Sequence, residues 1–128
     1  MEFRSAVVTG AASGIGRALA TRLASVGTRL VLADVQIAAL TNVAEELQAT
    51  AVPTDVGDDR AVEALAAAAP DAELVCLNAG IVGSALGTPW EAALHEWDRV
   101  LRVNLGGWST GCARLCPGWW RRVDPATS

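Results

Sequence analysis

The sequence predicts an α/β protein built on a doubly wound parallel sheet. Short apolar runs rich in valine and leucine alternate with segments of helical spacing through the first hundred residues. The helical segments are long enough for the crossover that joins two parallel strands. The chain has 128 residues, of which 52% are hydrophobic, and this suffices for a buried core. These observations together favour layers of helices packed on a parallel sheet.

Four segments carry the strand pattern. SAVVT ends at a glycine, TRLVLAD is a continuous apolar run that ends in an aspartate, and AELVCLNAG is equally apolar. The remaining segment, ATAVPTDV, is short. Continuous apolar runs are typical of strands that are buried on both faces of a sheet. The predicted strands are residues 5–9, 28–34, 49–56 and 72–80.

Four other segments have helical spacing. In GIGRALATRLASVG, apolar residues recur at intervals of three or four, and Gly27 fits the end of a helix. The segment that begins at Asp58 opens with two aspartates, which the positive end of a helix dipole favours. The last segment has a proline near its start. The predicted helices are residues 14–27, 37–48, 58–69 and 88–105.

Composition disfavours several classes of function. The net charge is -4 and most arginines are scattered, so a nucleic-acid partner is not expected. No apolar stretch is long enough to span a bilayer, and the first residues lack the pattern of a signal peptide. The 3 cysteines are an odd, sparse set, which argues against a disulfide framework. We therefore expect a cytoplasmic protein.

The reactive side chains outside the motifs have plain structural interpretations. Cys76 lies in an apolar strand, so it is expected in the core and not as a nucleophile. His95 is the only histidine and is expected at the surface. Cys112 and Cys116 have no further ligands near them in the sequence, so no metal site is predicted.

The strongest functional signal is TGAASGIG, residues 9–16, between the first predicted strand and helix. Glycines 10, 14 and 16 permit a tight turn and the close approach of a ligand. The helix that follows directs free N–H groups at this turn, which suits a pyrophosphate. Asp34 ends the second strand, where a carboxylate accepts hydrogen bonds from an adenosine ribose and repels a 2′-phosphate. The pattern predicts NAD in preference to NADP; in the alternative interpretation, Asp34 only caps the next helix.

This glycine spacing, with threonine before the first glycine, resembles the single-domain branch of the short-chain dehydrogenase/reductase family. Three later motifs continue the resemblance: TDV at 54–56, NAG at 78–80 and WDRVLRVNLGG at 97–107. The TDV segment resembles the one in which the family's aspartate, here Asp55, contacts the adenine ring. The resemblance implies the N-terminal part of a Rossmann-type domain, about four strands with flanking helices. It also implies a cofactor site that consists of Thr9, Gly10, Ser13, Gly14, Ile15, Gly16, Asp34, Asp55, Val56, Asn78, Ala79 and Gly80.

The resemblance further implies hydride transfer between NAD(H) and an alcohol or ketone. The family's catalytic tetrad is Asn, Ser, Tyr and Lys, and Asn104 is the only member that can be placed here. The chain has no tyrosine, and its 10 Lys and Arg residues are all arginine. We therefore expect an N-terminal cofactor-binding fragment that is inactive in isolation. The alternative is a non-catalytic nucleotide-binding or interaction module that docks on intact relatives.

The pattern changes at Gly107, which predicts a partial cofactor domain over residues 1–106 and an aberrant tail over residues 107–128. The tail contains GWWRRV and shows no clear helical period. In a shifted frame its codons permit a family-like helix, because every tryptophan codon then contributes to an apolar residue. Our hypothesis is out-of-frame translation after a lost base. A natural end and a segment that binds a membrane surface are the alternatives, the latter disfavoured by the two prolines.

A missing fifth strand would leave one edge of the fourth strand unpaired. Unpaired edges and uncovered apolar faces favour association with another chain. We therefore expect self-association through this edge and through the helix that carries Asn104, with a dinucleotide as the only other expected partner.

Overall fold

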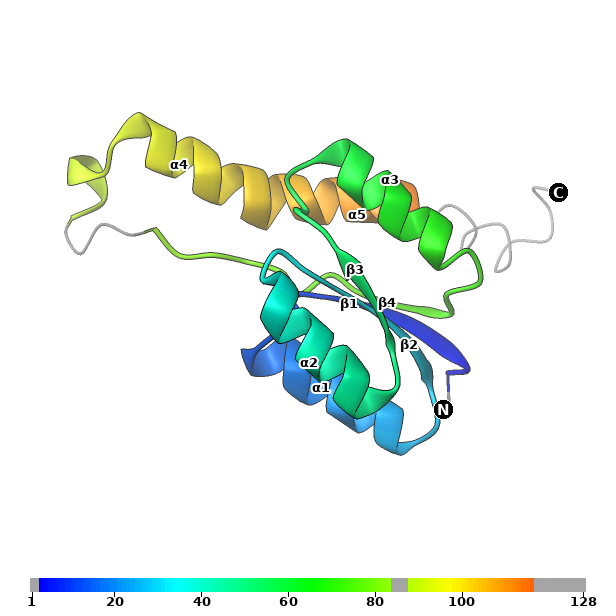
Figure 1. Cartoon of the computed structure of the whole chain (residues 1–128). Helices are drawn as coiled ribbons and strands as arrows, with labels where there is room; N and C mark the ends of the chain where they lie inside the picture. The colour runs from blue at the N-terminus through cyan, green and yellow to red at the C-terminus, as the bar shows by residue number, and fades with distance from the viewer. Residues whose placement is uncertain (1–2, 84–87, 117–128) are drawn as a thin grey trace, which may run out of the picture.

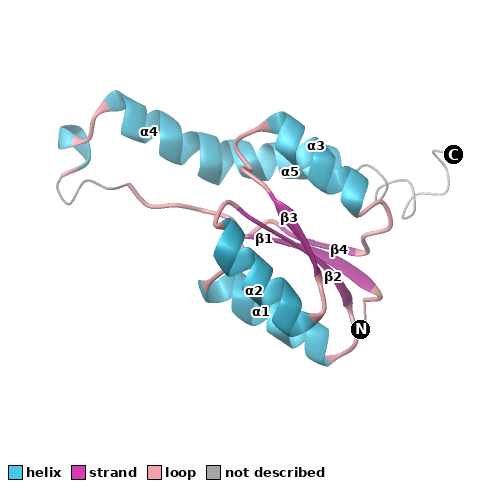
Figure 2. Ribbon diagram, viewed as in Figure 1, coloured by secondary structure: helices cyan, strands magenta, loops and turns pink. Residues whose placement is uncertain are grey.

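The computed structural model describes residues 3–83 and 88–116, and it confirms the predicted α/β class (Figures 1 and 2). The strands are β1 (Ser5–Thr9), β2 (Arg29–Asp34), β3 (Thr50–Pro53) and β4 (Leu74–Cys76). The helices are α1 (Gly14–Ser25), α2 (Ile37–Leu47), α3 (Asp59–Ala68), α4 (Leu94–Leu101) and α5 (Gly107–Leu115). A 3-10 turn, η1 (Pro89–Glu91), precedes α4, and a π-helix, η2 (Arg102–Gly106), joins α4 to α5.

The four strands are parallel and lie in the order β3-β2-β1-β4. On β1, Val7 pairs with Val31 of β2 on one side and with Val75 of β4 on the other. Helices α1 and α2 cover one face of the sheet, and α3 and α5 lie over the other (Figure 1). The winding direction reverses between β1 and β4. In doubly wound sheets, ligands bind at the carboxyl ends of the strands beside such a reversal.

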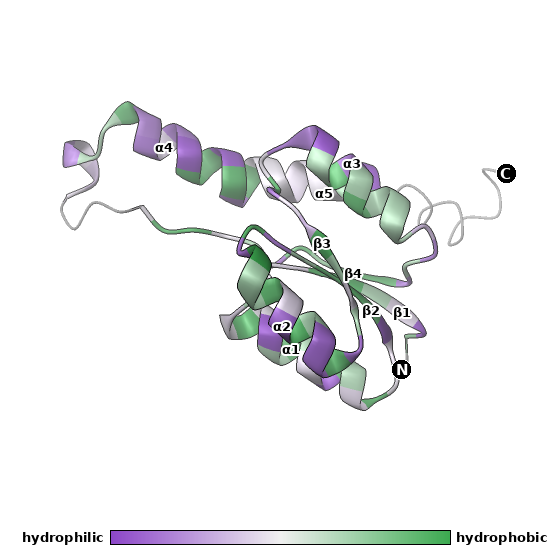
Figure 3. Ribbon diagram, viewed as in Figure 1, coloured by the Kyte–Doolittle hydropathy of each residue, from purple (hydrophilic) through white to green (hydrophobic). Residues whose placement is uncertain are grey.

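Two apolar clusters, one on each face of the sheet, form the core. Because successive side chains of a strand point to opposite faces, Val8 joins one cluster with Leu32 and Leu40, and Val7 joins the other with Leu65. All five side chains are fully buried. The strands are accordingly hydrophobic along most of their length (Figure 3). Burial on both faces explains the continuous apolar runs in the sequence.

Helix α5 contradicts the expectation that no helical period exists after Gly107. Its buried residues are Gly107 and Gly111, which lie four positions apart on one helix face. A Cβ atom at position 107 would lie 2.6 Å from Cγ2 of Val56, and one at position 111 would lie 2.5 Å from Cδ2 of Leu77. Because the buried positions of this helix are occupied by glycines, the spacing of hydrophobic residues in the sequence does not predict the helix.

An ion pair and an apolar contact also hold α5 in place. Arg114 donates hydrogen bonds of 3.0 and 2.7 Å to the two carboxylate oxygens of Asp59 on α3. These bonds lower the pKa of Asp59. Leu115 packs against the core cluster on the same face of the sheet. The out-of-frame origin of residues 107–128 stays a prediction, and residues 117–128, with the GWWRRV segment, lie outside the described part of the chain.

Strand β4 is shorter than the predicted strand 72–80. Its pairing ends at Cys76, because the N–H groups of Asn78 and Ala79 turn toward the hydroxyl oxygen of Thr9, at 3.0 and 3.1 Å. Within the described residues, β1 is the only strand beside β4, so β4 forms an edge of the sheet as expected. None of the helices in the described segments is both long enough and apolar enough to span a membrane.

Candidate functional site

A cavity of about 340 Å³ opens at the carboxyl ends of the strands, beside the reversal between β1 and β4. The predicted cofactor residues that line it come from loops far apart in the sequence. They are Gly10, Ser13, Gly14, Ile15, Asp34, Asp55, Val56, Asn78, Ala79 and Gly80. Thr9 and Gly16 do not line the cavity, and Asn104 follows Val103, which does. The structure thus brings most of the predicted site together in one place.

The glycine turn after β1 needs its glycines for three different reasons. Gly10 has a φ of +68°, and a Cβ atom there would lie 2.9 Å from the Cα atom of Ala79. A Cβ atom at Gly16 would lie 2.1 Å from the carbonyl oxygen of Gly10, so glycine is required for α1 to approach the turn. Gly14 has a φ of +54°, yet nothing lies within 4 Å of its added Cβ atom. Gly14 also lines the cavity.

The amino end of α1 lines this space and has neither a side-chain cap nor an acidic residue of its own. Ser13 is the N-cap residue, but its side chain makes no capping hydrogen bond, and the first turn contains no acidic residue. The free N–H groups of a first helical turn together with the helix dipole attract anions. The residues present here therefore fit the pyrophosphate of a dinucleotide.

Asp34 lines the same cavity from the end of β2 and is held by two backbone hydrogen bonds. Its Oδ2 atom accepts from the Ala12 N–H at 3.0 Å, and its Oδ1 atom accepts from the Gln36 N–H at 3.0 Å. The N-cap of α2 is Gln36, so the alternative in which Asp34 caps that helix does not describe the structure. Each carboxylate oxygen retains acceptor capacity, which suits a pair of ribose hydroxyl groups.

Thr9 and Asn78 connect the loops that follow β1 and β4. The buried Thr9 hydroxyl oxygen accepts from the N–H groups of Asn78 and Ala79. In return, the Asn78 side chain donates to the carbonyl oxygens of Thr9 at 3.1 Å and Gly10 at 3.4 Å. These residues therefore fix the shape of the cavity, because they hold the glycine turn against the Asn78–Gly80 loop.

Asp55 and Val56 form the wall that follows β3. The Asp55 Oδ1 atom accepts from the Gly57 N–H at 2.8 Å, while Oδ2 faces the Arg102 guanidinium at 3.5 Å. Val56 is buried and contacts Gly107 closely. The resemblance places the adenine ring beside Asp55, and the structure puts this residue at the same cavity as Asp34.

Asn104 lies in the π-helix η2 and pairs with the backbone of one residue. Its Oδ1 atom accepts from the Ile81 N–H, and its Nδ2 group donates to the Ile81 carbonyl, both at 2.8 Å. This pairing fixes Ile81 in the loop after β4. Because Ile81 lines the cavity, Asn104 helps to hold the wall of the cavity in place. Both functional groups of the Asn104 side chain are engaged in this contact.

The other reactive residues stay outside the cavity. Cys76 packs against the Val8 cluster, and burial raises the pKa of its thiol, which disfavours the nucleophilic thiolate. His95 is exposed, as predicted. Burial also raises the pKa of Cys116. The described residues contain no group of three or more His, Cys, Asp or Glu side chains that could hold a metal ion.

The sequence profile of the short chain dehydrogenase family matches residues 4–123. This chain belongs to the short-chain dehydrogenase family. The match covers the glycine turn, Asp34, the Asn78–Gly80 loop and Asn104. Its extent also includes α5, which the sequence pattern alone placed outside the domain.

Two relatives illustrate how much of a family member this chain contains. The 1-deoxy-11-beta-hydroxypentalenate dehydrogenase of Streptomyces arenae is 48% identical over 111 residues, which are 79% of this chain and 39% of that protein. The 2-dehydro-3-deoxy-L-rhamnonate dehydrogenase (NAD(+)) of Sphingomonas sp. (strain SKA58) is 37% identical over 109 residues, 81% of this chain and 43% of that protein. The chain thus spans about two fifths of the length of these relatives.

Solved structures of the family share the fold closely. A short chain dehydrogenase/reductase from Burkholderia phymatum in complex with NAD has a TM-score of 0.85 and 38% identity, over 91% of this chain and 44% of that chain. L-sorbose reductase from Gluconobacter frateurii, complexed with NADPH and L-sorbose, has a TM-score of 0.85 and 29% identity, over 95% of this chain and 49% of that chain. Family members of this fold are thus solved with either dinucleotide.

Sequence reasoning missed several residues that line the cavity. Each lies one or two positions from a residue that the sequence analysis assigned to the site, at the carboxyl end of a strand or in η2. They are Val35, Gln36, Thr54, Ile81 and Val103. The signal was available, because the chain on either side of a motif residue at a strand end must pass the same crevice.

Proposed function

We propose that this chain is the cofactor-binding part of an NAD-dependent oxidoreductase. In the proposed complex, the pyrophosphate lies at the amino end of α1 and the adenosine ribose lies at Asp34. The observation that carries the proposal is that these two features line one cavity. A helix end without an acidic residue or a side-chain cap lies beside a carboxylate that two backbone N–H groups hold in place.

The preference for NAD over NADP rests on Asp34. Among the described residues, Asp34 has no ion pair, so its negative charge stands unneutralised beside the cavity. A 2′-phosphate on the same ribose would meet this charge at short range, whereas the free hydroxyl groups of NAD would donate to it. The cofactor named for the Sphingomonas relative is NAD(+).

Isothermal titration calorimetry with NAD and NADP tests the proposal. NAD should bind more tightly than NADP, and Asp34→Ala should weaken NAD by about tenfold and narrow the gap to NADP, because charge-assisted hydrogen bonds are lost. Asp98→Ala removes an exposed carboxylate on α4 and is the matched control, so it should change neither affinity. Equal affinities of the unmodified chain for NAD and NADP would remove Asp34 from this role.

The proposed reaction of the whole family member is hydride transfer between NAD(H) and an alcohol or ketone. Such a transfer needs a group that moves a proton at the substrate oxygen. The resemblance assigns that proton to a tyrosine whose pKa a lysine lowers, and this chain contains neither residue type. We therefore expect no turnover by the isolated 128-residue chain.

NADH absorbance, followed over a panel of secondary alcohols and ketones, measures that turnover. The purified chain should give no rate above a buffer blank. A rate that survives removal of host reductases and disappears in Gly14→Ala would contradict the expectation. Restoring the shifted frame after codon 106 should create activity, if the out-of-frame hypothesis is correct.

A second candidate function is a non-catalytic module that docks on another chain. The observation in its favour is a row of exposed apolar side chains along α4, η2 and α5, which consists of Leu94, Trp97, Leu101, Leu105 and Trp108. Such rows are typical of interaction surfaces. Self-association through this row and the β4 edge stays a proposal. Sedimentation of the wild-type chain and of Leu101→Glu tests it, and a monomer at high concentration would contradict it.

A further inference from the structure

Arg102 connects the helix that carries Asn104 to the wall of the cavity that contains Asp55. It is the first residue of η2, and its Nη1 atom lies 3.5 Å from the Asp55 Oδ2 atom. The other carboxylate oxygen of Asp55 is held by the Gly57 N–H. The two side chains are half exposed, at 52% and 44%. Among the described residues, Arg102 is therefore the one residue outside the Asp55–Gly57 turn whose side chain contacts the Oδ2 atom of Asp55.

The contact is built into the loop and is more than an encounter of two surface charges. A Cβ atom at Gly57 would lie 2.7 Å from Nη1 and 3.1 Å from Cγ of Arg102. The side chain of Arg102 therefore lies directly over Gly57, and any larger residue at that position would displace it. The Arg102 side chain thus contacts both Asp55 and Gly57, the first and last residues of this turn.

The π-helix explains why one segment can contact both walls of the cavity. The Gly107 N–H donates to the Arg102 carbonyl, an i→i+5 bond that widens the helix. At one end of this turn, Arg102 contacts Asp55, and at the other end, Gly107 contacts Val56. Asn104 lies between them and pairs with Ile81 in the loop after β4.

We propose that Arg102 is a positioning residue that holds Asp55 at the adenine end of the cavity and links it to η2. The inference rests on the proposed dinucleotide site and adds a residue to which the sequence analysis assigned no role. Loss of Arg102 frees the Asp55 carboxylate to rotate about the Gly57 contact. Ligands that contain adenine should then bind more weakly, while ligands that contain only the nicotinamide nucleotide should be unaffected.

Calorimetry of the full chain with NAD, AMP and nicotinamide mononucleotide tests this inference. Arg102→Ala should weaken NAD and AMP by the same factor, about two- to fivefold, which is the range of exposed ion pairs. The affinity for nicotinamide mononucleotide should not change. Arg102→Lys keeps the charge and should restore part of the loss. Arg99→Ala is the matched control, because Arg99 lies one turn earlier and pairs with Glu96 instead.

A double-mutant cycle decides whether Arg102 acts through Asp55. In an Asp55→Asn background, Arg102→Ala should cause little further loss of AMP affinity. The inference is overturned by full additivity, by equal effects of the Arg102 and Arg99 variants, or by an equal loss of affinity for nicotinamide mononucleotide. If the unmodified chain binds neither NAD nor AMP, the proposed function itself fails and takes the inference with it.

Discussion

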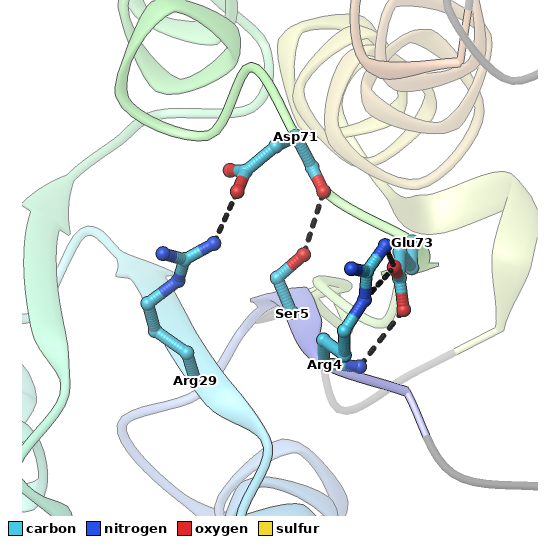
Figure 4. Close-up of polar contacts among 5 residues, drawn as sticks. All are labelled: Arg4, Ser5, Arg29, Asp71 and Glu73. Atoms are coloured by element: carbon cyan, nitrogen blue, oxygen red, sulfur yellow. Dashed lines mark hydrogen bonds and ion pairs between the residues drawn. The ribbon is translucent and has the colours of Figure 1, made fainter.

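The two ends of the sheet differ in how their charged side chains are paired. At the amino ends, Arg4 pairs with Glu73 and Arg29 pairs with Asp71 (Figure 4). Ser5 adds a hydrogen bond of 2.6 Å to the Asp71 carbonyl. The hollow among these five residues measures about 400 Å³, so it is no smaller than the cavity at the carboxyl ends.

The difference lies in how the polar groups are satisfied. Each charged side chain at the amino ends has a side-chain partner of opposite charge, so the charges neutralise one another. At the carboxyl ends, Asp34 accepts only from backbone N–H groups, and the first turn of α1 carries no carboxylate. We therefore expect binding in this fold to follow from unneutralised charge on a rigid backbone and not from the volume of a hollow.

The largest expected effect on stability comes from substitution of the glycines in the turn after β1, and it should differ between Gly16 and Gly14. Gly16→Ala should lower the free energy of unfolding by about 3 kcal/mol, because the added methyl group would overlap the Gly10 carbonyl oxygen. Gly14→Ala should cost about 1 kcal/mol, since its methyl group meets only the strain of a positive φ. Denaturant unfolding measures both.

Gly14→Ala also separates an effect on NAD binding from an effect on stability. Gly14→Ala should nonetheless reduce NAD binding, because Gly14 lines the cavity at the amino end of α1, where the pyrophosphate is proposed to bind. If Gly14→Ala binds NAD as tightly as the unmodified chain, the ligand does not approach the backbone at α1, and the carboxyl-end assignment is wrong.

A smaller effect is expected at the amino ends. Arg29→Ala should change the free energy of unfolding by about 0.5 kcal/mol, because its ion pair with Asp71 is exposed. The affinity for NAD should stay the same. Arg22→Ala, on the exposed side of α1 with no ion pair among the described residues, is the control for arginine loss. Weaker NAD binding in Arg29→Ala alone would show that the two ends of the sheet are not independent.

Much of the fold could be predicted because local patterns and packing agree. The apolar runs and the glycines that end them predicted the bounds of β1 and α1 to within two residues. The alternation of strand and helix patterns predicted the parallel sheet. The end of β4 could not be predicted, since it depends on long-range hydrogen bonds from Asn78 to Thr9. Helix α5 was missed because its buried face consists of glycines.

The site shows the same division. Residues in glycine or acidic motifs at strand ends could be predicted to lie at one cavity, because the carboxyl ends of parallel strands meet at one edge of the sheet. Gln36 and Ile81 were not, since they enter the cavity only as chain neighbours of such residues. Arg102 was also missed, because its contact with Asp55 joins segments 47 positions apart that no local pattern relates.

Amide chemical shifts of the labelled chain, recorded by NMR during titration with NAD, test the central claim most directly. We expect the largest shifts at Gly14, Ile15 and Gln36 and in the Asn78–Gly80 loop, with Arg4 and Arg29 at the amino ends unchanged. NADP at the same concentration should cause smaller shifts. Saturable shifts centred on Arg4 and Arg29, or no saturable shift with NAD at all, would contradict the account.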